Sequence, residues 1–373
     1  MIIEIIFWIT VLILGMTFLG YPIILYVFSL FIRDEQIHSV DSIPKVTLLI
    51  SAFNESKVIE RKIKNSLSLS YPDLEILVIS DGSSDGTDAI CAQYVPRIRL
   101  IHSDSNQGKN YAINQALPQI DSEIIVFSDA NAFYKKDAIE HLVKHYILPK
   151  VGCVVGNLVL SQTEMSDVSR GEGLYWKYEH FLKILESKFG TLLVANGTIF
   201  SARKALLSQL ETDVANDFQI PMKISSLGFQ VRYEPEAVAY EKTATDSREE
   251  YNRKVRIVNR GIRGFIKLKK YLRGFRLFEF LFHKFFRWIS GLLSVLLFLS
   301  SAILWQQPFY RIVLIVQIIF YALALVGSVA KSKMKLFYIP SYICLIHISA
   351  SVAIVKAITG QTFSKWAPPQ TSR

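Results

Sequence analysis

The sequence predicts an α/β protein with a mostly parallel, Rossmann-like sheet, flanking helices and additional transmembrane helices. Between residues 46 and 145, short apolar runs alternate with amphipathic stretches, which is typical of strands and helices in a parallel sheet. Further apolar runs near both ends approach the roughly 20 residues that a helix needs to cross a bilayer. Of the 373 residues 51% are apolar, and the mean hydropathy is +0.29, which disfavours a purely soluble protein.

The charge and the cysteines narrow the functional classes. The formal net charge of +10 indicates a partner that carries phosphates, either lipid headgroups or a nucleotide. Nucleic acid is the competing partner, and the membrane-length apolar runs argue against it. Cys91, Cys153 and Cys344 lie far apart and form no C-x-x-C pair. This spacing predicts neither a disulfide framework nor a zinc site, and it fits a reducing compartment.

Residues 1–33 are predicted to form an N-terminal transmembrane helix. Residues 5–32 hold no charged side chain, and Arg33 ends the run. The run follows Glu4 rather than a basic segment, is longer than the apolar core of a signal peptide, and is not followed by a small-residue cleavage site. We therefore expect a retained anchor.

Residues 288–360 are predicted to hold about three more transmembrane helices, followed by a tail over residues 361–373. The three apolar runs span residues 288–305, 312–330 and 336–355. The last run contains Pro340 and His347, so a kinked, re-entrant or buried helix remains an alternative there.

The link between the last two runs predicts the orientation. It carries three lysines, Lys331, Lys333 and Lys335. By the positive-inside rule this link is cytoplasmic, and so is the region of about residues 33–287. We expect a multi-pass protein of the cell membrane with its large domain in the cytoplasm.

Residues 34–246 are predicted to form that cytoplasmic domain. Strands are expected at residues 46–53, 75–80, 98–102 and 124–128, and helices near residues 58–69, 85–94, 109–117 and 136–145. In such sheets ligands bind outside the carboxyl ends of the strands. Polar residues at these ends are therefore the candidates for chemistry.

The first two strand ends offer polar side chains. Asn54 and Glu55 follow the first strand, and Asp81 begins an acidic turn at the tip of the second. For Asp81 we favour a ligand contact over a plain turn. For Asp85 and Thr87, farther along the same turn, we favour turn and helix-capping roles.

The next two strand ends suit a phosphate and a cation. Gly108 and Lys109 open a helix after the third strand, where an anion can bind. Asp129 and Asn131 follow the fourth strand and can direct two oxygens into one cavity. A hard divalent cation that bridges phosphates takes such ligands. The alternative is a loop aspartate with local hydrogen bonds.

These motifs, in this order and spacing, resemble the family 2 glycosyltransferases of the GT-A fold, over about residues 46–287. The resemblance implies an inverting transfer from a nucleotide sugar, usually a UDP-sugar. It implies that Asn54, Glu55 and Asp81 line the uridine pocket. Asp129 would be the chief acid of the family's D-x-D motif, which holds Mg²⁺ or Mn²⁺. Asn131 stands where the motif has its second acid, which is a departure from the pattern.

Two downstream segments extend the resemblance. Residues 194–198 resemble the acceptor-side segment, which implies acceptor contacts for Asn196 and Gly197. Residues 216–221 resemble the segment of the general base, which would be Asp217; a helix N-cap is the alternative for this residue.

Residues 247–287 are predicted to form basic, amphipathic helices on the membrane surface. Residues 248–287 hold thirteen Lys or Arg against three Glu, interleaved with apolar residues. Arg253 and Arg256 keep the basic spacing of the family's Q/R-x-x-R-W motif, which implies contacts to the donor diphosphate, as for Lys109. The tryptophan and the leading glutamine of that motif are absent, which puts processive polymerisation in doubt.

The predicted function is a membrane-bound inverting glycosyltransferase that adds a hexose or N-acetylhexosamine to a polysaccharide or glycolipid acceptor. One alternative is transfer to a polyprenyl phosphate carrier. Another is a non-catalytic scaffold or export component with the same fold. Four membrane runs are few for a polymer channel, so a homo-oligomer or an export partner is also expected.

Overall fold

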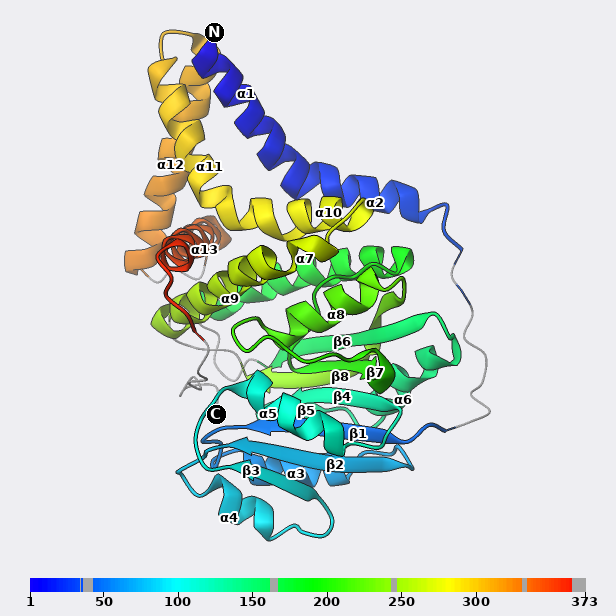
Figure 1. The fold of residues 1–373 in the computed structure, drawn as a ribbon. Coiled ribbons are helices and arrows are strands. Elements are labelled where there is room, and N and C mark those ends of the chain that lie inside the picture. Colours follow the sequence, from blue (N-terminus) through cyan, green and yellow to red (C-terminus); the bar gives the residue numbers. More distant parts are fainter. Residues whose placement is uncertain (34, 36–42, 162–166, 243–246, 331–333, 364–373) are drawn as a thin grey trace.

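The structure is a computed structural model, and it describes residues 1–33, 35, 43–161, 167–242, 247–330 and 334–363. Within these residues a sheet of eight strands lies at one end of the molecule and apolar helices project from the other (Figure 1). The strand order is β3-β2-β1-β4-β7-β6-β8-β5. Lys331 and Lys333 of the orientation argument, and the tail from residue 364, lie outside the described residues.

The first half of the sheet is parallel, as the sequence predicts. Its strands are β1 (Val46–Ala52), β2 (Leu74–Asp81), β3 (Arg99–Ser103) and β4 (Ile124–Asp129). β1 pairs with β2 and β4, and β2 pairs with β3, all in parallel. The intervening helices are α3 (Ile59–Leu67), α4 (Thr87–Ala92) and α5 (Lys109–Ala116), the last continued by η2 (Leu117–Gln119). Because these strands are parallel, their carboxyl ends meet at one edge.

The second half of the sheet is mixed. Its strands are β5 (Phe133–Tyr134), β6 (Val151–Ser161), β7 (Ile199–Arg203) and β8 (Gln230–Lys242). β7 runs antiparallel to both β4 and β6, whereas β6 and β8 are parallel. β5 pairs antiparallel with the far end of β8.

Apolar clusters cover both faces of the sheet. One face packs against α3 and α6 (Ala138–Val143), which η3 (Lys144–Ile147) continues. The other packs against α5 and α8 (Asn216–Ser226), with the Phe127 and Phe200 rings stacked 4.7 Å apart between neighbouring strands. The short η4 (Lys204–Leu206) follows β7. Burial of these side chains is the main favourable contribution to this domain's stability.

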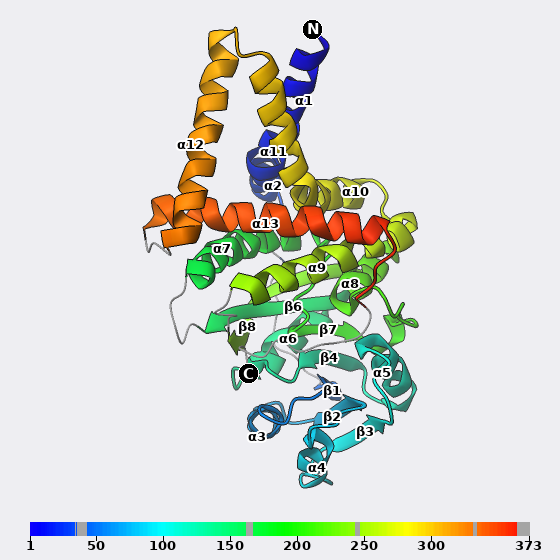
Figure 2. The same cartoon turned by 90° about the vertical axis from the view of Figure 1, so that its left-hand side faces the viewer.

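Long helices connect the sheet domain to the apolar part. α7 (Asp167–Phe189) and α9 (Ser247–Leu268) lie between the sheet and the apolar helices (Figures 1 and 2). η5 (Lys269–Tyr271) and α10 (Phe275–Phe280) follow α9. α9 is therefore the predicted basic helix at the boundary between the two parts.

Four helical segments of the described chain are long and apolar enough to cross a membrane, spanning Ile2–Ser29, Phe275–Ile303, Pro308–Ala330 and Lys335–Ile358. The first comprises α1 (Ile2–Gly15), the π-helical η1 (Met16–Gly20) and α2 (Tyr21–Ser29). The second comprises α10, the π-helical η6 (Leu281–Phe285) and α11 (Phe286–Ile303). Both segments change direction near their π-helical turns (Figure 1).

The last two segments are α12 (Pro308–Ala330) and α13 (Lys335–Ile358). α11 and α12 project away from the sheet, whereas α13 lies across their base and alongside α9 (Figure 2). Ala350 and Ala353 of α13 pack against Val255 and Val258 of α9. Residues 336–355, for which the sequence leaves several arrangements open, therefore pack directly on the boundary helix.

Candidate functional site

A cavity of about 760 Å³ lies between the edge of the sheet at which the parallel strands end and the helices α7, α9, α11 and α13, which we call the membrane-side helices. It brings together most of the residues predicted for the site: Lys109, Asp129, Asn131, Asn196, Gly197, Asp217, Arg253 and Arg256. These residues come from the ends of strands, the start of α5, the start of α8 and one face of α9. The two predicted acids, Asp129 and Asp217, therefore face the same space.

Asp129 ends β4 and is paired with a cation. Lys109 Nζ lies 2.5 Å from Asp129 Oδ1, and both side chains are mostly buried. Lys109 begins α5 directly after Gly108, whose φ of 100° is one that glycine adopts readily. The strand end and the helix start predicted from sequence thus converge on one ion pair.

A buried lysine holds the loop that follows Asp129. Lys62 of α3 donates a hydrogen bond to the carbonyl of Ala132, and its ammonium lies 4.1 Å from the centre of the Tyr134 ring. Burial lowers the pKa of Lys62 to about 7, although the charge of Asp129 opposes this shift. Lys62 therefore links α3 to the Asp129 loop, a contact that the sequence pattern of α3 does not reveal.

Asn131 meets a carboxylate that sequence reasoning missed. Its amide nitrogen donates to Glu241 Oε1 at 2.9 Å, and both residues line the cavity. The contact follows from strand pairing, because Phe133 of β5 lies opposite Tyr240 of β8. Since the amide nitrogen is the donor, the amide oxygen of Asn131 is available as an acceptor or ligand.

Asp217 is the second residue of α8, not its N-cap. The N-cap is Ala215, and the start of the helix has no side-chain capping bond. A Cβ built on Gly197 would lie 3.2 Å from Asp217 Oδ2, so the glycine leaves room for the carboxylate. Burial raises the pKa of Asp217, and the nearby charge of Asp129 raises it further. The positive charges of Lys109 and Arg260 lower it, but the pKa remains above its ordinary value.

Asn196 is held from two sides. Its amide nitrogen donates to the carbonyl of Gly156 at 2.6 Å, and its amide oxygen accepts a hydrogen bond from the Lys183 ammonium. Asn196 is buried, as is Lys183 on α7. These contacts position the segment that carries Gly197. Lys183 is a residue that sequence reasoning missed.

Three arginines of α9 line the cavity. Arg253 binds Glu250 at 2.7 Å, and burial lowers the pKa of Arg253 to about 10. Arg260 donates to the carbonyl of Val214 at 3.2 Å and lies close enough to Asp217 to affect its pKa. Sequence reasoning selected Arg253 and Arg256 but missed Arg260. The spacing of Arg253, Arg256 and Arg260 could have identified Arg260, because helical residues separated by three, four and seven positions lie on the same face.

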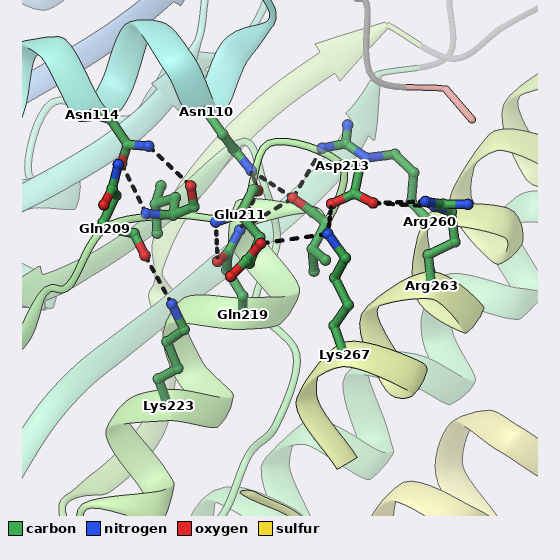
Figure 3. A network of polar contacts seen from close by, with 12 residues as sticks. Asn110, Asn114, Gln209, Glu211, Asp213, Gln219, Lys223, Arg260, Arg263 and Lys267 are labelled. Carbon is green, nitrogen blue, oxygen red and sulfur yellow. Dashed lines mark hydrogen bonds and ion pairs between the residues drawn. The ribbon is translucent and has the colours of Figure 1, made fainter. Parts of the chain in front are cut away.

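A polar network fixes the loop that leads into α8 (Figure 3). Asp213 is paired with Arg263 at 2.8 Å and with Lys267 at 2.6 Å, both from α9. From the opposite side, Asn110 of α5 donates to the carbonyl of Val214 at 2.5 Å. The loop is thus tied to both neighbouring helices directly before Asp217.

The residues predicted for the uridine pocket lie around the neighbouring strand ends. Asp81 is almost fully buried and accepts hydrogen bonds from the backbone N–H groups of Gln107 and Gly108, at 3.0 and 2.7 Å. Asn54 accepts one from the backbone of Ser84 at 2.8 Å. These contacts organise the loops before Lys109 and after β2.

Glu55 is fully buried, and its backbone N–H donates to Thr87 at 2.8 Å. Among the described residues, Asn54, Glu55 and Asp81 lie outside the lining of the large cavity. Their contacts with the nucleotide stay a prediction. Asp85 accepts hydrogen bonds from the backbones of Ser56 and Thr87, in keeping with the structural role favoured for it.

Comparison with known proteins identifies the domain. Residues 47–210 match the model of the family described as Glycosyl transferase family 2. The chain thus contains a family 2 glycosyltransferase domain. This confirms the resemblance carried by the strand-end motifs.

Curated relatives of this glycosyltransferase are polysaccharide synthases. The poly-beta-1,6-N-acetyl-D-glucosamine synthase of Staphylococcus epidermidis (strain ATCC 35984) is 25% identical over 220 residues, which is 57% of this chain and 52% of that protein. The synthase of the same name from Staphylococcus aureus (strain COL) is 27% identical over 210 residues, covering 54% and 51%. The matches span about half the length of these relatives.

A solved structure shows the same fold. The mannosyltransferase PcManGT from Pyrobaculum calidifontis, in complex with GDP-Man and Mn²⁺, superposes with a TM-score of 0.71 at 21% sequence identity. The superposition covers 95% of this chain and 99% of that chain. The shared fold therefore includes the membrane-side helices as well as the sheet.

Proposed function

We propose that this glycosyltransferase moves a hexose or N-acetylhexosamine from a UDP-sugar to an acceptor hydroxyl, with inversion, at the cytoplasmic face of the cell membrane. The observation that carries the proposal is that Asp129 and Asp217 line one cavity together with Lys109 and Arg260. A single displacement needs a base on the acceptor side and positive charge on the diphosphate side. The four side chains supply both.

Asp217 is the proposed base. Its pKa is raised toward neutral pH, and a general base is most effective when its pKa lies near the working pH. The deprotonated carboxylate can still accept a proton. Its place beside Gly197 lets an acceptor approach without a side chain in the way. The acceptor hydroxyl would give its proton to Asp217 as its oxygen bonds to the anomeric carbon.

Cations face the leaving group. Lys109, Arg253, Arg256 and Arg260 line the cavity and would stabilise the charge that develops on the departing diphosphate. The arginines come from one face of α9, and the lysine from the start of α5. Because the fold holds these cations in place before the reaction, they need not be reorganised when charge develops on the diphosphate.

The chain's oxygen ligands fit Mg²⁺ or Mn²⁺. Asp129 and Glu241 offer carboxylates, and Asn131 offers its amide oxygen, which are the ligand types that hard divalent cations take. We propose that these residues hold the cation, with Glu241 supplying the second carboxylate that Asn131 lacks. When bound, the cation would neutralise phosphate charge.

The test is sugar transfer by the full-length protein in membranes. Radiolabelled UDP-sugars are supplied with Mg²⁺, with Mn²⁺ or with a chelator, and both labelled product and released UDP are measured. The proposal requires metal-dependent transfer that Asp217→Asn removes. Transfer at the normal rate by the purified Asp217→Asn protein would assign the base elsewhere. Failure of every UDP-sugar to bind or react would favour the scaffold alternative.

A further inference from the structure

The cavity extends well beyond the two acids, toward the membrane part. Its remaining wall includes apolar and aromatic side chains of α7, α11 and α13: Tyr175, Trp288, Ile339, Ile343 and Ile346. α11 and α13 belong to segments long and apolar enough to cross a membrane. The space in front of Asp217 is therefore continuous with surfaces that suit a hydrocarbon chain.

Cations surround Tyr175 in this wall. The Lys254 ammonium lies 4.3 Å from the ring centre of Tyr175, and the Arg287 guanidinium lies 5.2 Å from it. Lys284 lies beside Arg287, since both bind Glu179, at 3.2 and 2.5 Å respectively. We call Lys254, Lys284, Arg287 and Tyr175 the basic cluster.

The basic cluster and its neighbours carry more positive than negative charge. Among the described residues, Lys183 adjoins the cluster, which gives four cations; Glu250 binds Lys254, and Glu179 binds Lys284 and Arg287. A third buried carboxylate nearby, Glu186, is paired with His283 at 2.5 Å. Burial lowers the pKa of Lys254 to about 8, and that of Lys183 to about 8. Buried cations in excess of carboxylates are stabilised by an anion from outside the chain.

Glu179 does not cancel this excess. Burial alone would raise its pKa, but Lys284, Arg287 and His283 lower the pKa well below its ordinary value. Glu179 is therefore a fixed anion at neutral pH and already serves several cations. A phosphate would add the missing negative charge and accept hydrogen bonds from lysine and arginine.

We propose that the acceptor is a glycosylated lipid whose phosphate or diphosphate, between chain and sugar, binds the basic cluster while its hydrocarbon chain lies along α13. This inference rests on the proposed function. Because Asp217 is placed to accept a proton, the nucleophile is a sugar hydroxyl, not the phosphate itself. The hydroxyl oxygen bonds to the anomeric carbon, its proton goes to Asp217, and the bond to the UDP oxygen breaks with both electrons leaving on UDP.

The first experiment compares acceptors with the unmodified full-length protein in detergent. The probes are a polyprenyl diphosphate-linked monosaccharide, the same sugar on a neutral alkyl chain, the sugar diphosphate without a chain, a soluble oligosaccharide and polyprenyl phosphate. We expect kcat/KM for the charged glycolipid to exceed that for the neutral one by about tenfold or more, the effect of one charged hydrogen bond. Equal values for these two, or a preference for the soluble oligosaccharide or polyprenyl phosphate, would overturn the inference.

The second experiment uses Lys254→Gln and Lys284→Gln. Each should raise KM for the charged glycolipid about tenfold, with much less change in KM for the UDP-sugar, and reduce the advantage over the neutral glycolipid. Lys269→Gln is the matched control, because Lys269 is exposed beyond the end of α9 and lies outside the cavity lining. Unchanged acceptor preference in folded Lys254→Gln and Lys284→Gln proteins would contradict the inference.

The two proposals fail in different ways. If the protein transfers sugar from UDP-sugars equally well to charged and neutral acceptors, the acceptor inference is wrong and the proposed function stands. If UDP-sugars neither bind nor release UDP with any acceptor, the proposed function itself is wrong. Thermal unfolding of each variant in detergent identifies any that fails to fold, and the acceptor comparison with the unmodified protein then decides.

Discussion

Asp217 has a carboxylate that its surroundings destabilise, and it lies beside a glycine. It begins a helix, yet burial and Asp129 raise its pKa despite Lys109 and Arg260. Gly197 leaves the space beside its carboxylate free of a side chain. The sequence could suggest the role of Asp217 through its motif, but the opposing charges around it come from α5, β4 and α9 and depend on the fold.

Asp217→Asn should lower kcat about 10²–10⁴-fold, because the amide cannot act as a base, while UDP-sugar binding is retained. The measurement is steady-state transfer together with binding of the UDP-sugar by calorimetry. Asp121→Asn, at an exposed position outside the cavity lining, is the control and should stay active. Loss of donor binding along with kcat would indicate a different role.

The raised pKa of Asp217 also predicts a pH profile. A base must be deprotonated, so kcat should fall as the pH is lowered through the folded pKa, at a higher pH than for an ordinary aspartate. For the same reason, charging Asp217 at neutral pH destabilises the fold, and Asp217→Asn should raise the thermal midpoint slightly. An acid limb at the ordinary aspartate value would contradict this prediction.

Glu241 should govern cation affinity. Glu241→Gln should weaken Mn²⁺ binding about tenfold to a hundredfold, as losses of ligands or of their hydrogen-bonding partners do. Asn131→Asp should strengthen binding, since it adds a carboxylate beside Asp129. Mn²⁺ titration followed by electron paramagnetic resonance measures both without requiring turnover. Equal Mn²⁺ affinity in the original and Glu241→Gln proteins would exclude Glu241 from the site.

At the scale of elements, the local parts of the fold were the predictable ones. β1 to β4 and α3 to α5 appear near their predicted bounds, because apolar runs and helix-start residues lie within short stretches of sequence. The Asn131–Glu241 contact joins residues 110 positions apart and depends on the pairing of β5 with β8. Periodicity carries no information about such pairing, which is why Glu241 was missed.

The packing of α9 on α8 should be sensitive to a single methyl group. A Cβ built on Gly264 would lie 2.7 Å from Phe218, the neighbour of Asp217, so Gly264→Ala must displace that ring. We expect a cost of about 1–3 kcal/mol in the free energy of unfolding, together with lower kcat. Thermal unfolding in detergent provides the measurement.

Gly15→Ala is the matched control for Gly264→Ala. Gly15 is also helical, and a Cβ built there meets no atom within 4 Å among the described residues. Since alanine favours helix by about 1 kcal/mol over glycine, this variant should be neutral or more stable. A similar loss of stability in both variants would show that the Phe218 contact is not the cause.

At the scale of the whole molecule, the arrangement of the apolar helices could not be predicted from composition. α12 and α13 are similar in length, at 23 and 24 residues, and both are apolar enough to cross a membrane, with mean hydropathies of 2.6 and 1.8. Yet α12 projects from the domain and α13 lies across its base (Figure 2). The difference arises from packing, such as that of Ala350 and Ala353 on α9. Small residues allow the helices to approach closely.

The proposed orientation predicts which loops can be labelled from each side. Gln306, between α11 and α12, should react from outside when replaced by cysteine, because the link between these helices lies far from the sheet, near the N-terminus (Figure 1). Its neighbour Gln307 donates a hydrogen bond to Glu4. Lys269→Cys should react only after the cells are permeabilised. A membrane-impermeant maleimide makes the measurement, with the unmodified protein as background, and the reverse pattern would place the domain outside.

The position of α13 also determines whether the concentration of a lipid acceptor should be expressed per volume of solution or per amount of lipid. Because this helix forms a wall of the cavity, the proposed glycolipid acceptor would reach Asp217 by lateral diffusion, without first leaving the lipid phase. The rate would then follow the mole fraction of the reactant in lipid. Diluting the vesicles with buffer at a constant UDP-sugar concentration would leave the rate per protein unchanged, whereas adding inert phospholipid to the same bilayers would slow it.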